Sequence, residues 1–227
     1  MPSLRMTPAR GLVLAAFTLV VSAVVACAGG PDDPGGGVTN PSTSSGMTLS
    51  TQPGASGTLF DPPPPAAGFT LVGEDGEDVS LSDFRGKVVA LYFGYTHCPD
   101  VCPLTLGTYK AALERLPTEV SEHVSVVMIS VDPERDTPEV LGRYMGLFNP
   151  DFTGLSGSLE DVDAVLAAWG IQIRRGTPDD IGAYAVDHPA ASWIIDQQGR
   201  LRVKVAHMTG TDALAADLRS IVEEGTE

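Results

Sequence analysis

The sequence has 227 residues, of which 43% are hydrophobic, and its formal net charge is −15. A chain of this length forms one or two domains. The acidic excess argues against nucleic acid as a partner and against close adsorption to anionic lipid, because both carry negative charge.

Residues 1–26 have the features of a secretion signal. They contain Arg5 and Arg10, no acidic residue and the apolar run GLVLAAFTLVVSAVVA. This run is shorter than the roughly 20 residues that a membrane-spanning helix needs. The string VVAC that ends at Cys27 resembles the lipobox of bacterial lipoproteins, which implies that Cys27 becomes the lipidated first residue of the mature protein. The alternative is an ordinary cleavage nearby, which leaves Cys27 as a free thiol.

Residues 27–67 predict a tether between this signal and a folded domain. Gly, Pro, Ser and Thr dominate the segment, and it has no apolar periodicity. A flexible coil of about 40 residues spans roughly 35 Å root mean square, so a tethered domain could search nearby surface. For the end of the segment, Thr58 to Pro65, an ordered arm packed on the domain is the open alternative.

Residues 68–227 predict one domain in which strands alternate with helices. In its first half we expect a hairpin of two short strands around Asp75-Gly76 and then a turn or short helix at 82–86. A buried strand at 87–93 follows, then a helix from 103 to 116 that Pro117 ends, and a second buried strand at 124–131. In its second half we expect a helix capped by Thr137, with Pro138 at its first position, and a helix capped by Ser158, with Val162, Val165, Leu166 and Trp169 facing inward. After these helices we expect strands at 171–174, 183–186, 191–195 and 201–206 and a final helix at 212–223.

This alternation predicts an α/β fold with a mainly parallel central sheet, helices on both faces and a closing antiparallel hairpin. Functional groups of such sheets gather at the carboxyl ends of the strands. Three segments should therefore lie along one rim: the loop after Phe93, the loop from Asp132 to Asp136, and the stretch that ends at His188.

Cys98 and Cys102 are spaced CxxxC where a buried strand gives way to a helix. If Cys102 lies in the first helical turn, Cys98 falls near the same face, so both sulfurs can reach one metal ion or each other. The positive end of the helix dipole favours thiolate over thiol, and the thiolate is both the nucleophile and the ligand of soft metals. In an exported protein the pair can be a disulfide bond, a metal site, or both in turn.

Three strings of the domain resemble one branch of the thioredoxin superfamily. FGYTHCPDVCPLTL, ISVDPERDTPEVL and VDHPAASWIIDQQGRL look like the Sco/SenC proteins, and the likeness runs from about Phe69 to the C-terminus. The resemblance implies a membrane-tethered copper chaperone that helps to assemble the dinuclear CuA centre of cytochrome c oxidase. It also implies that Cys98 and Cys102 supply two copper thiolates and His188 the imidazole. This donor set suits both Cu(I) and Cu(II), whereas a closed structural zinc site needs four protein ligands.

One position departs from the family pattern. Sco proteins usually have Ser or Thr after the liganding histidine, and here Pro189 follows His188. Proline restricts the residue before it to extended conformations and lacks an amide donor. The direction of the His188 ring is therefore a question for the structure.

The remaining polar candidates have ordinary interpretations. We expect a structural or outer-shell role for His97, a solvated His123 and a loop position for His207. Asp132 and Asp136 are either an outer shell around the metal or the histidine, or carboxylates that build the loop before a helix.

The leading function is thus a lipid-anchored, extracytoplasmic copper chaperone that acts as a monomer on the oxidase subunit carrying the CuA site, rather than an enzyme. One alternative is a thiol-disulfide oxidoreductase in which Cys98 and Cys102 reduce cysteines of that subunit. The other is a peroxiredoxin-like thiol peroxidase. Thioredoxin-like reductases use CxxC rather than CxxxC, and disulfide exchange needs no imidazole across the rim, so His188 favours the chaperone.

Overall fold

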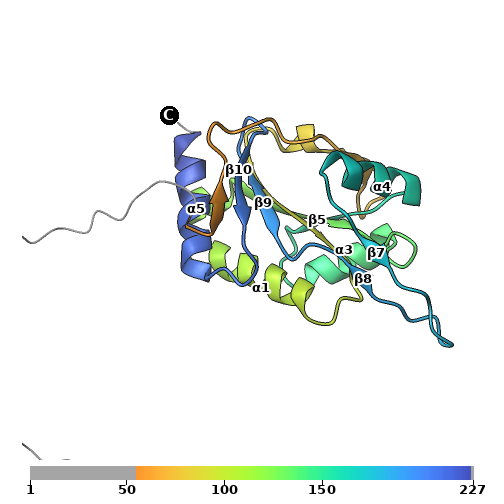
Figure 1. Cartoon of the computed structure of the whole chain (residues 1–227). Helices are drawn as coiled ribbons and strands as arrows, with labels where there is room; N and C mark the ends of the chain where they lie inside the picture. Colours follow the sequence, from red (N-terminus) through yellow and green to blue (C-terminus); the bar gives the residue numbers. More distant parts are fainter. Residues whose placement is uncertain (1–54, 226–227) are drawn as a thin grey trace, which may run out of the picture. The chain divides into compact units, whose positions relative to one another are not determined.

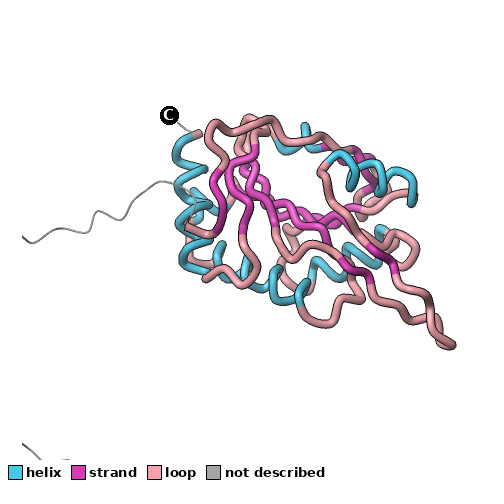
Figure 2. The backbone as a smooth tube through the Cα atoms, in the orientation of Figure 1, coloured by secondary structure: helices cyan, strands magenta, loops and turns pink. Residues whose placement is uncertain are grey.

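A computed structural model describes residues 55–225, so the signal, Cys27 and most of the predicted tether lie outside the described part. The described residues form a six-stranded sheet in the order β1-β10-β9-β4-β5-β6, together with two small two-stranded sheets, β2-β3 and β7-β8 (Figures 1 and 2). The strands are β1 (Gly57–Leu59), β2 (Thr70–Val72), β3 (Asp78–Ser80), β4 (Val88–Gly94), β5 (Val124–Ser130), β6 (Thr153–Leu155), β7 (Arg174–Arg175), β8 (Val186–Asp187), β9 (Ser192–Ile195) and β10 (Leu201–Val205). The helices are η1 (Leu81–Phe84), α1 (Val101–Leu113), α2 (Thr118–Ser121), α3 (Pro138–Gly146), α4 (Leu159–Ala168) and α5 (Thr211–Glu224).

The strand pairing confirms the predicted fold class. Strand β5 is parallel to β4 on one side and to β6 on the other. Strand β9 pairs antiparallel with β4, and β10 closes the hairpin by pairing antiparallel with β9. The parallel part of the sheet is therefore the half formed by β4, β5 and the edge strand β6, and the other strands pair antiparallel.

The core lies around β4, all seven residues of which are buried. A strand covered on both faces has to be apolar throughout, as the sequence pattern indicated. Helices α1, α3 and α5 lie on one side of the sheet and α4 lies on the other (Figure 1). Phe93 at the end of β4 packs against Trp169 and Trp193, with ring centroids 5.6 and 5.5 Å apart, so an aromatic cluster supports the end of the strand that carries the cysteine loop.

The end of the predicted tether is an ordered arm, which was the second of the two alternatives left open. Strand β1 pairs antiparallel with β10. Further along, the amide of Ala66 donates to the carbonyl of Gly199 at 2.9 Å. Ahead of β1, the buried carboxylate of Asp217 on α5 accepts the amide and the hydroxyl of Ser56 at 2.8 and 2.5 Å. The arm thus covers the edge of β10 that would otherwise stay unpaired.

Several boundaries differ from the prediction. Helix α1 ends at Leu113 rather than Leu116, because its last turn closes with hydrogen bonds between residues three apart, as from Leu116 to Leu113. The strands expected at 171–174 and 183–186 were wrong, since β7 and β8 begin later and pair with each other outside the central sheet. The short elements α2 and β6 were not predicted. No helix among residues 55–225 is long and apolar enough to cross a membrane.

Candidate metal centre

The cysteine loop joins the most buried strand of the sheet to helix α1. Strand β4 ends at Gly94, α1 begins at Val101, and the amide of Cys98 donates to the carbonyl of Tyr95 at 3.3 Å to close a turn. Cys102 is the second residue of α1 and is fully buried, whereas Cys98 is half-buried in the loop. Both cysteines are free thiols. The predicted strand-to-helix junction is therefore confirmed.

The fold brings His188 to the two cysteines. His188 follows β8, and its Nε2 lies 3.6 Å from the Sγ of Cys102. One ligand atom from each of Cys98, Cys102 and His188 lies within 4.8 Å of the others. Three donors at these separations fit around a single small ion. The family resemblance implied this set of residues, and the fold brings Cys102 and His188 together across 86 positions of the chain.

Pro189 orients the His188 ring through its carbonyl group. The Nδ1 of His188 lies 3.1 Å from the carbonyl oxygen of Pro189, and a carbonyl oxygen can only accept a hydrogen bond. The tautomer that donates to this carbonyl carries its proton on Nδ1, which leaves the lone pair of Nε2 facing Cys102. The rings of Tyr92 and Tyr95 meet the imidazole edge-on at centroid distances of 6.0 and 5.5 Å. The departure from the family pattern thus leaves the ring directed at the cysteines.

Burial sets the protonation of both groups in the absence of metal. Burial raises the pKa of Cys102 to about 12, although the Tyr92 hydroxyl lowers it by donating to Sγ at 3.4 Å. The helix N-terminus was expected to favour thiolate over thiol, and at Cys102 in the metal-free protein burial acts in the opposite direction. Burial also lowers the pKa of His188, which favours the neutral imidazole that binds metals.

Asp132 and Asp136 are fully buried in the loop between β5 and α3. Asp136 accepts the amide and the hydroxyl of Thr96 at 3.0 and 2.6 Å, so it holds the start of the cysteine loop. Asp132 accepts the Tyr184 hydroxyl at 2.6 Å and the Arg135 Nε at 2.5 Å. Both carboxylates are occupied by these donors, and neither belongs to the group of closely spaced ligand atoms.

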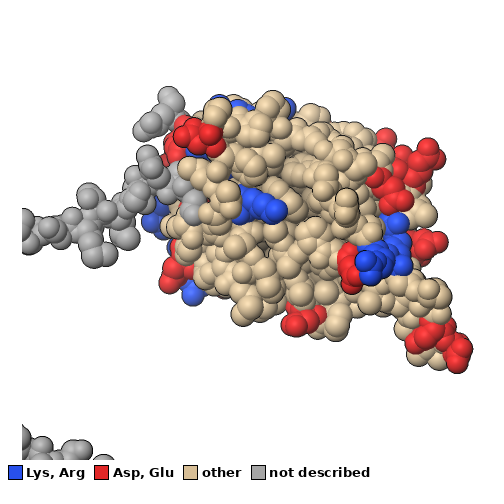
Figure 3. Space-filling model, in the orientation of Figure 1, with Lys and Arg blue, Asp and Glu red and all other residues tan. Residues whose placement is uncertain are grey.

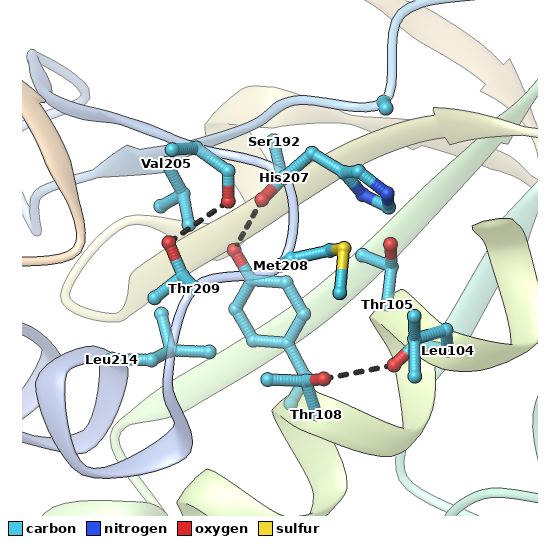
Figure 4. Close-up of a pocket in the computed structure, with 12 residues that line it drawn as sticks. Leu104, Thr105, Thr108, Ser192, Val205, His207, Met208, Thr209 and Leu214 are labelled. Carbon is cyan, nitrogen blue, oxygen red and sulfur yellow. Dashed lines mark hydrogen bonds between the residues drawn. The ribbon is translucent and has the colours of Figure 1, made fainter. Parts of the chain in front are cut away.

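The other histidines lie outside this group. His97 is half-exposed, and its Nδ1 lies 3.1 Å from the hydroxyl of Thr96. His123 lies at the opposite end of the sheet, where its carbonyl accepts the amide of Val88 at the start of β4. His207 is exposed in the loop after β10, where it lines a small pocket with Met208 and Thr105 (Figure 4). His207 thus occupies the loop position expected for it, whereas His123 is partly buried rather than fully solvated.

The segment between β7 and β8 projects from the body of the domain (Figures 1 and 2). Acidic side chains mark its tip, whereas much of the face shown in Figure 3 carries no charge. The exposed residues Asp179 and Asp180 belong to this tip. His188 therefore sits at the base of a projecting acidic segment.

The donor set selects for soft metals. Two thiolates favour Cu(I), and an added imidazole suits Cu(I) and Cu(II) alike. A closed zinc site needs a fourth protein ligand, and the group found among the described residues has three. The fold and the site together define a thioredoxin-like protein with a soft-metal site at the rim of its sheet.

Comparison with known proteins identifies the family. The family model described as SCO1/SenC matches residues 61–223. The chain therefore belongs to the SCO1/SenC family, as its motifs indicated.

Two curated relatives illustrate the range of the likeness. A putative copper-binding protein of Stutzerimonas stutzeri is 31% identical over 153 residues, which cover 67% of this chain and 74% of that protein. The mitochondrial SCO1 homolog 1 of Arabidopsis thaliana is 35% identical over 130 residues, which cover 57% of this chain and 39% of the relative. This chain matches 56% of the length of Schizosaccharomyces pombe sco1 and 50% of the bovine SCO2 homolog, so it spans about half of these relatives.

Solved structures show the same fold. Apo Sco1 from Thermus thermophilus is 42% identical, with a TM-score of 0.68 over 74% of this chain and 97% of the other. Bradyrhizobium japonicum ScoI, solved with copper bound, is 33% identical, with a TM-score of 0.63 over 69% and 98%. A SCO1/SenC family lipoprotein from Bacillus anthracis is 26% identical, with a TM-score of 0.57 over 69% and 94%.

Proposed function

We propose that this protein is a copper metallochaperone whose cargo is held by Cys98, Cys102 and His188. The observation that carries the proposal is the convergence of two thiols and one imidazole within 4.8 Å at the rim of the sheet. Copper in the structure of the Bradyrhizobium relative supports the choice of metal. Soft sulfur ligands favour the same choice on chemical grounds.

Each ligand has a distinct part in this proposal. Cys98 is half-buried and meets the incoming ion first, and the buried Cys102 then completes a two-thiolate site. Each thiol releases its proton as it binds, so uptake of one Cu(I) by both cysteines releases two protons. The Tyr92 hydroxyl stabilises the Cys102 thiolate by donating to it. His188 adds the nitrogen ligand that Cu(II) needs more than Cu(I).

We further propose that the protein delivers copper to the CuA site of cytochrome c oxidase, outside the cytoplasm, from a lipid anchor at Cys27. In this proposal residues 1–26 are the signal, and a tether links Cys27 to the folded domain. The sequence before Cys27 and the family resemblance support this assignment. A related Bacillus anthracis protein is described as a lipoprotein.

The thiol peroxidase and oxidoreductase alternatives have weaker support from the site. A nucleophilic cysteine is normally exposed and has a lowered pKa. Cys102 is fully buried and its pKa is raised, so only Cys98 could be the attacking thiol in either alternative. A metal site tolerates a thiol like that of Cys102, because the binding energy of the ion offsets the cost of removing the proton.

Metal analysis of the purified protein tests the proposal. The reduced protein should take up one equivalent of Cu(I) in competition with a chelator of known affinity. A Cys98→Ser/Cys102→Ser variant should lose this uptake while keeping its fold by circular dichroism. Stoichiometric uptake by the double variant would place the copper site elsewhere and reject the proposal.

A further inference from the structure

The segment that carries His188 is fastened to the rest of the domain through the loop between β5 and α3. We call residues 174–187 the His188 hairpin, because β7 and β8 pair within it and His188 follows directly. Two arginines hold it. The Nε of Arg175 donates to the carbonyl of Val131 at 3.1 Å, which fixes its outer strand. The inner strand, β8, and the residues before it are held by contacts with Arg135 and its neighbours.

Arg135 lies among three segments that meet at the rim. Its Nε donates to the buried Asp132 of its own loop. Its guanidinium lies 3.5 Å from the ring centroid of Tyr184 on the His188 hairpin and 5.7 Å from that of Tyr95 in the cysteine loop. The Tyr184 hydroxyl also donates to Asp132 at 2.6 Å. Arg135 and Asp132 thus hold Tyr184 by its ring face and by its hydroxyl group.

Tyr95 connects these contacts to His188. The amide of Val186 donates to the Tyr95 hydroxyl at 3.3 Å, and the Tyr95 ring meets the His188 ring at an interplanar angle of 88°. The His188 imidazole therefore packs against the Tyr95 ring. Tyr95 in turn lies near the Arg135 guanidinium, and its hydroxyl accepts a hydrogen bond from the backbone of the hairpin. A shift of the hairpin would move Val186 and His188 together.

Arg135 occupies this position at a cost. One of its Nη atoms is buried and has no hydrogen-bond partner among the described residues. A buried donor without a partner is unfavourable, and in native proteins it calls for a specific reason. One such reason is that the planar guanidinium can stack on the Tyr184 ring while its Nε donates to Asp132, and lysine has no planar group that stacks in this way.

We propose that Arg135 is the positioning residue for His188, with Asp132 and Tyr184 as its partners. The proposal rests on the proposed copper site. In this proposal the cluster sets which ligands the copper site contains. When the hairpin stays packed against Arg135, the site contains Cys98, Cys102 and His188. When the hairpin moves away, the site contains the two thiolates alone. Because imidazole matters more to Cu(II) than to Cu(I), the cluster selects for retention of Cu(II).

The test uses Arg135→Lys, which keeps the charge but loses the planar stack, and Tyr184→Phe, which keeps the ring but loses the bond to Asp132. Outer-shell changes typically weaken metal binding about 10- to 100-fold. We expect a loss of this size in Cu(II) affinity for Arg135→Lys, a smaller loss for Tyr184→Phe, and little change in Cu(I) affinity for either. Arg143→Lys, an exposed arginine on α3, is the matched control and should change neither affinity.

A second readout needs no metal. In the metal-free Arg135→Lys protein, hydrogen exchange of the Val186 amide should accelerate, and the NMR contact between the rings of Tyr95 and His188 should weaken. In a His188→Ala background, Arg135→Lys should cause no further loss of Cu(II) affinity, because it acts through the missing ring. An equal loss in that background, or unchanged exchange and Cu(II) affinity in the single variant, would overturn the inference. Failure of the unmodified protein to bind Cu(I) would instead overturn the proposed function.

Discussion

The Nε2 of His188 lies 3.6 Å from the Sγ of Cys102, although 86 positions separate the two residues in the chain. The contact depends on the pairing of two strands. Strand β9, which begins four residues after His188, pairs antiparallel with β4, and Tyr92 near the end of β4 is the partner of Ser192. The start of β9 is therefore held at the rim where the cysteine loop begins.

Replacement of His188 tests its role as a ligand. His188→Ala should leave a two-thiolate site that still holds Cu(I), though more weakly, and should lower Cu(II) affinity by about 100-fold or more, at or above the upper figure for outer-shell changes. Competition titrations with both ions measure the effect. Reduction of a small disulfide by the two cysteines should change little, since that chemistry runs through sulfur. His123→Ala, at the other end of the sheet, is the control. Unchanged Cu(II) binding together with lost disulfide reduction would give His188 an acid-base role instead.

Copper and a disulfide bond should exclude each other. Both need the sulfurs of Cys98 and Cys102, which are free thiols close enough to share one ion. A Cys98-Cys102 bridge leaves no thiolate to ligate. Titration of Cu(I) into fully oxidised protein without reductant should show no one-to-one uptake, and added reductant should restore it. Full uptake by the oxidised protein would show that the cysteines are not the ligands.

The two thiols should react at different rates in the metal-free protein. Cys98 is half-buried, while Cys102 is fully buried and has a pKa of about 12. Because the thiolate is the reactive form, labelling of Cys102 should be slow at neutral pH and should accelerate as pH rises toward that pKa. Mass spectrometry after timed alkylation measures both rates. Faster labelling of Cys102 than of Cys98 at pH 7 would contradict the buried position of Cys102.

Gly94 leaves the space into which Cys102 fits. A Cβ atom at this position would lie 2.7 Å from the Tyr92 ring, 2.9 Å from the Cys102 Sγ and 3.2 Å from the Met128 Sδ. Gly94→Ala should therefore displace Cys102, weaken Cu(I) binding and destabilise the fold by about 1–3 kcal/mol, as for other overpacked cores.

Gly107→Ala provides the control for this substitution. Gly107 lies inside α1, and a Cβ there meets no atom within 4 Å. Alanine should stabilise that helix by roughly 0.5–1 kcal/mol and leave copper binding unchanged. Denaturant unfolding and Cu(I) competition compare the two variants. Equal stability and copper affinity of Gly94→Ala and the unmodified protein would mean that the site relaxes more easily than its packing indicates.

Lipid attachment at Cys27 predicts where the protein is found in the cell. Cys27→Ser should release the protein from washed membranes, because the proposed anchor is covalent lipid on that sulfur. Fractionation followed by immunoblotting compares the variant with the unmodified protein, and Cys98→Ser serves as the control for loss of a thiol. A Cys27→Ser protein that stays bound to membranes would place the anchor elsewhere in the chain.

Local patterns in the sequence determined the elements that carry the cysteines. The apolar run at 87–93, the CxxxC spacing and the helical pattern after it predicted β4, the cysteine loop and α1, because each depends on neighbours within a few residues. The caps at Thr137 and Ser158 are present for the same reason, since a cap bonds amides of its own helix. Strand β6 has only three residues and weak periodicity, so no local signal marked it.

Tertiary structure alone decided how these elements act together. The family resemblance named His188 as a ligand, but its distance from Cys102 is set by the pairing of β9 with β4. The pKa of Cys102 depends on packing from all sides, and burial raises it, against the direction expected from the helix N-terminus. The roles of Asp132 and Asp136 could not be read locally either, because their partners Tyr184 and Thr96 lie 52 and 40 positions away. Short-range pattern thus placed the sulfurs, and long-range packing set their protonation and the geometry of the site.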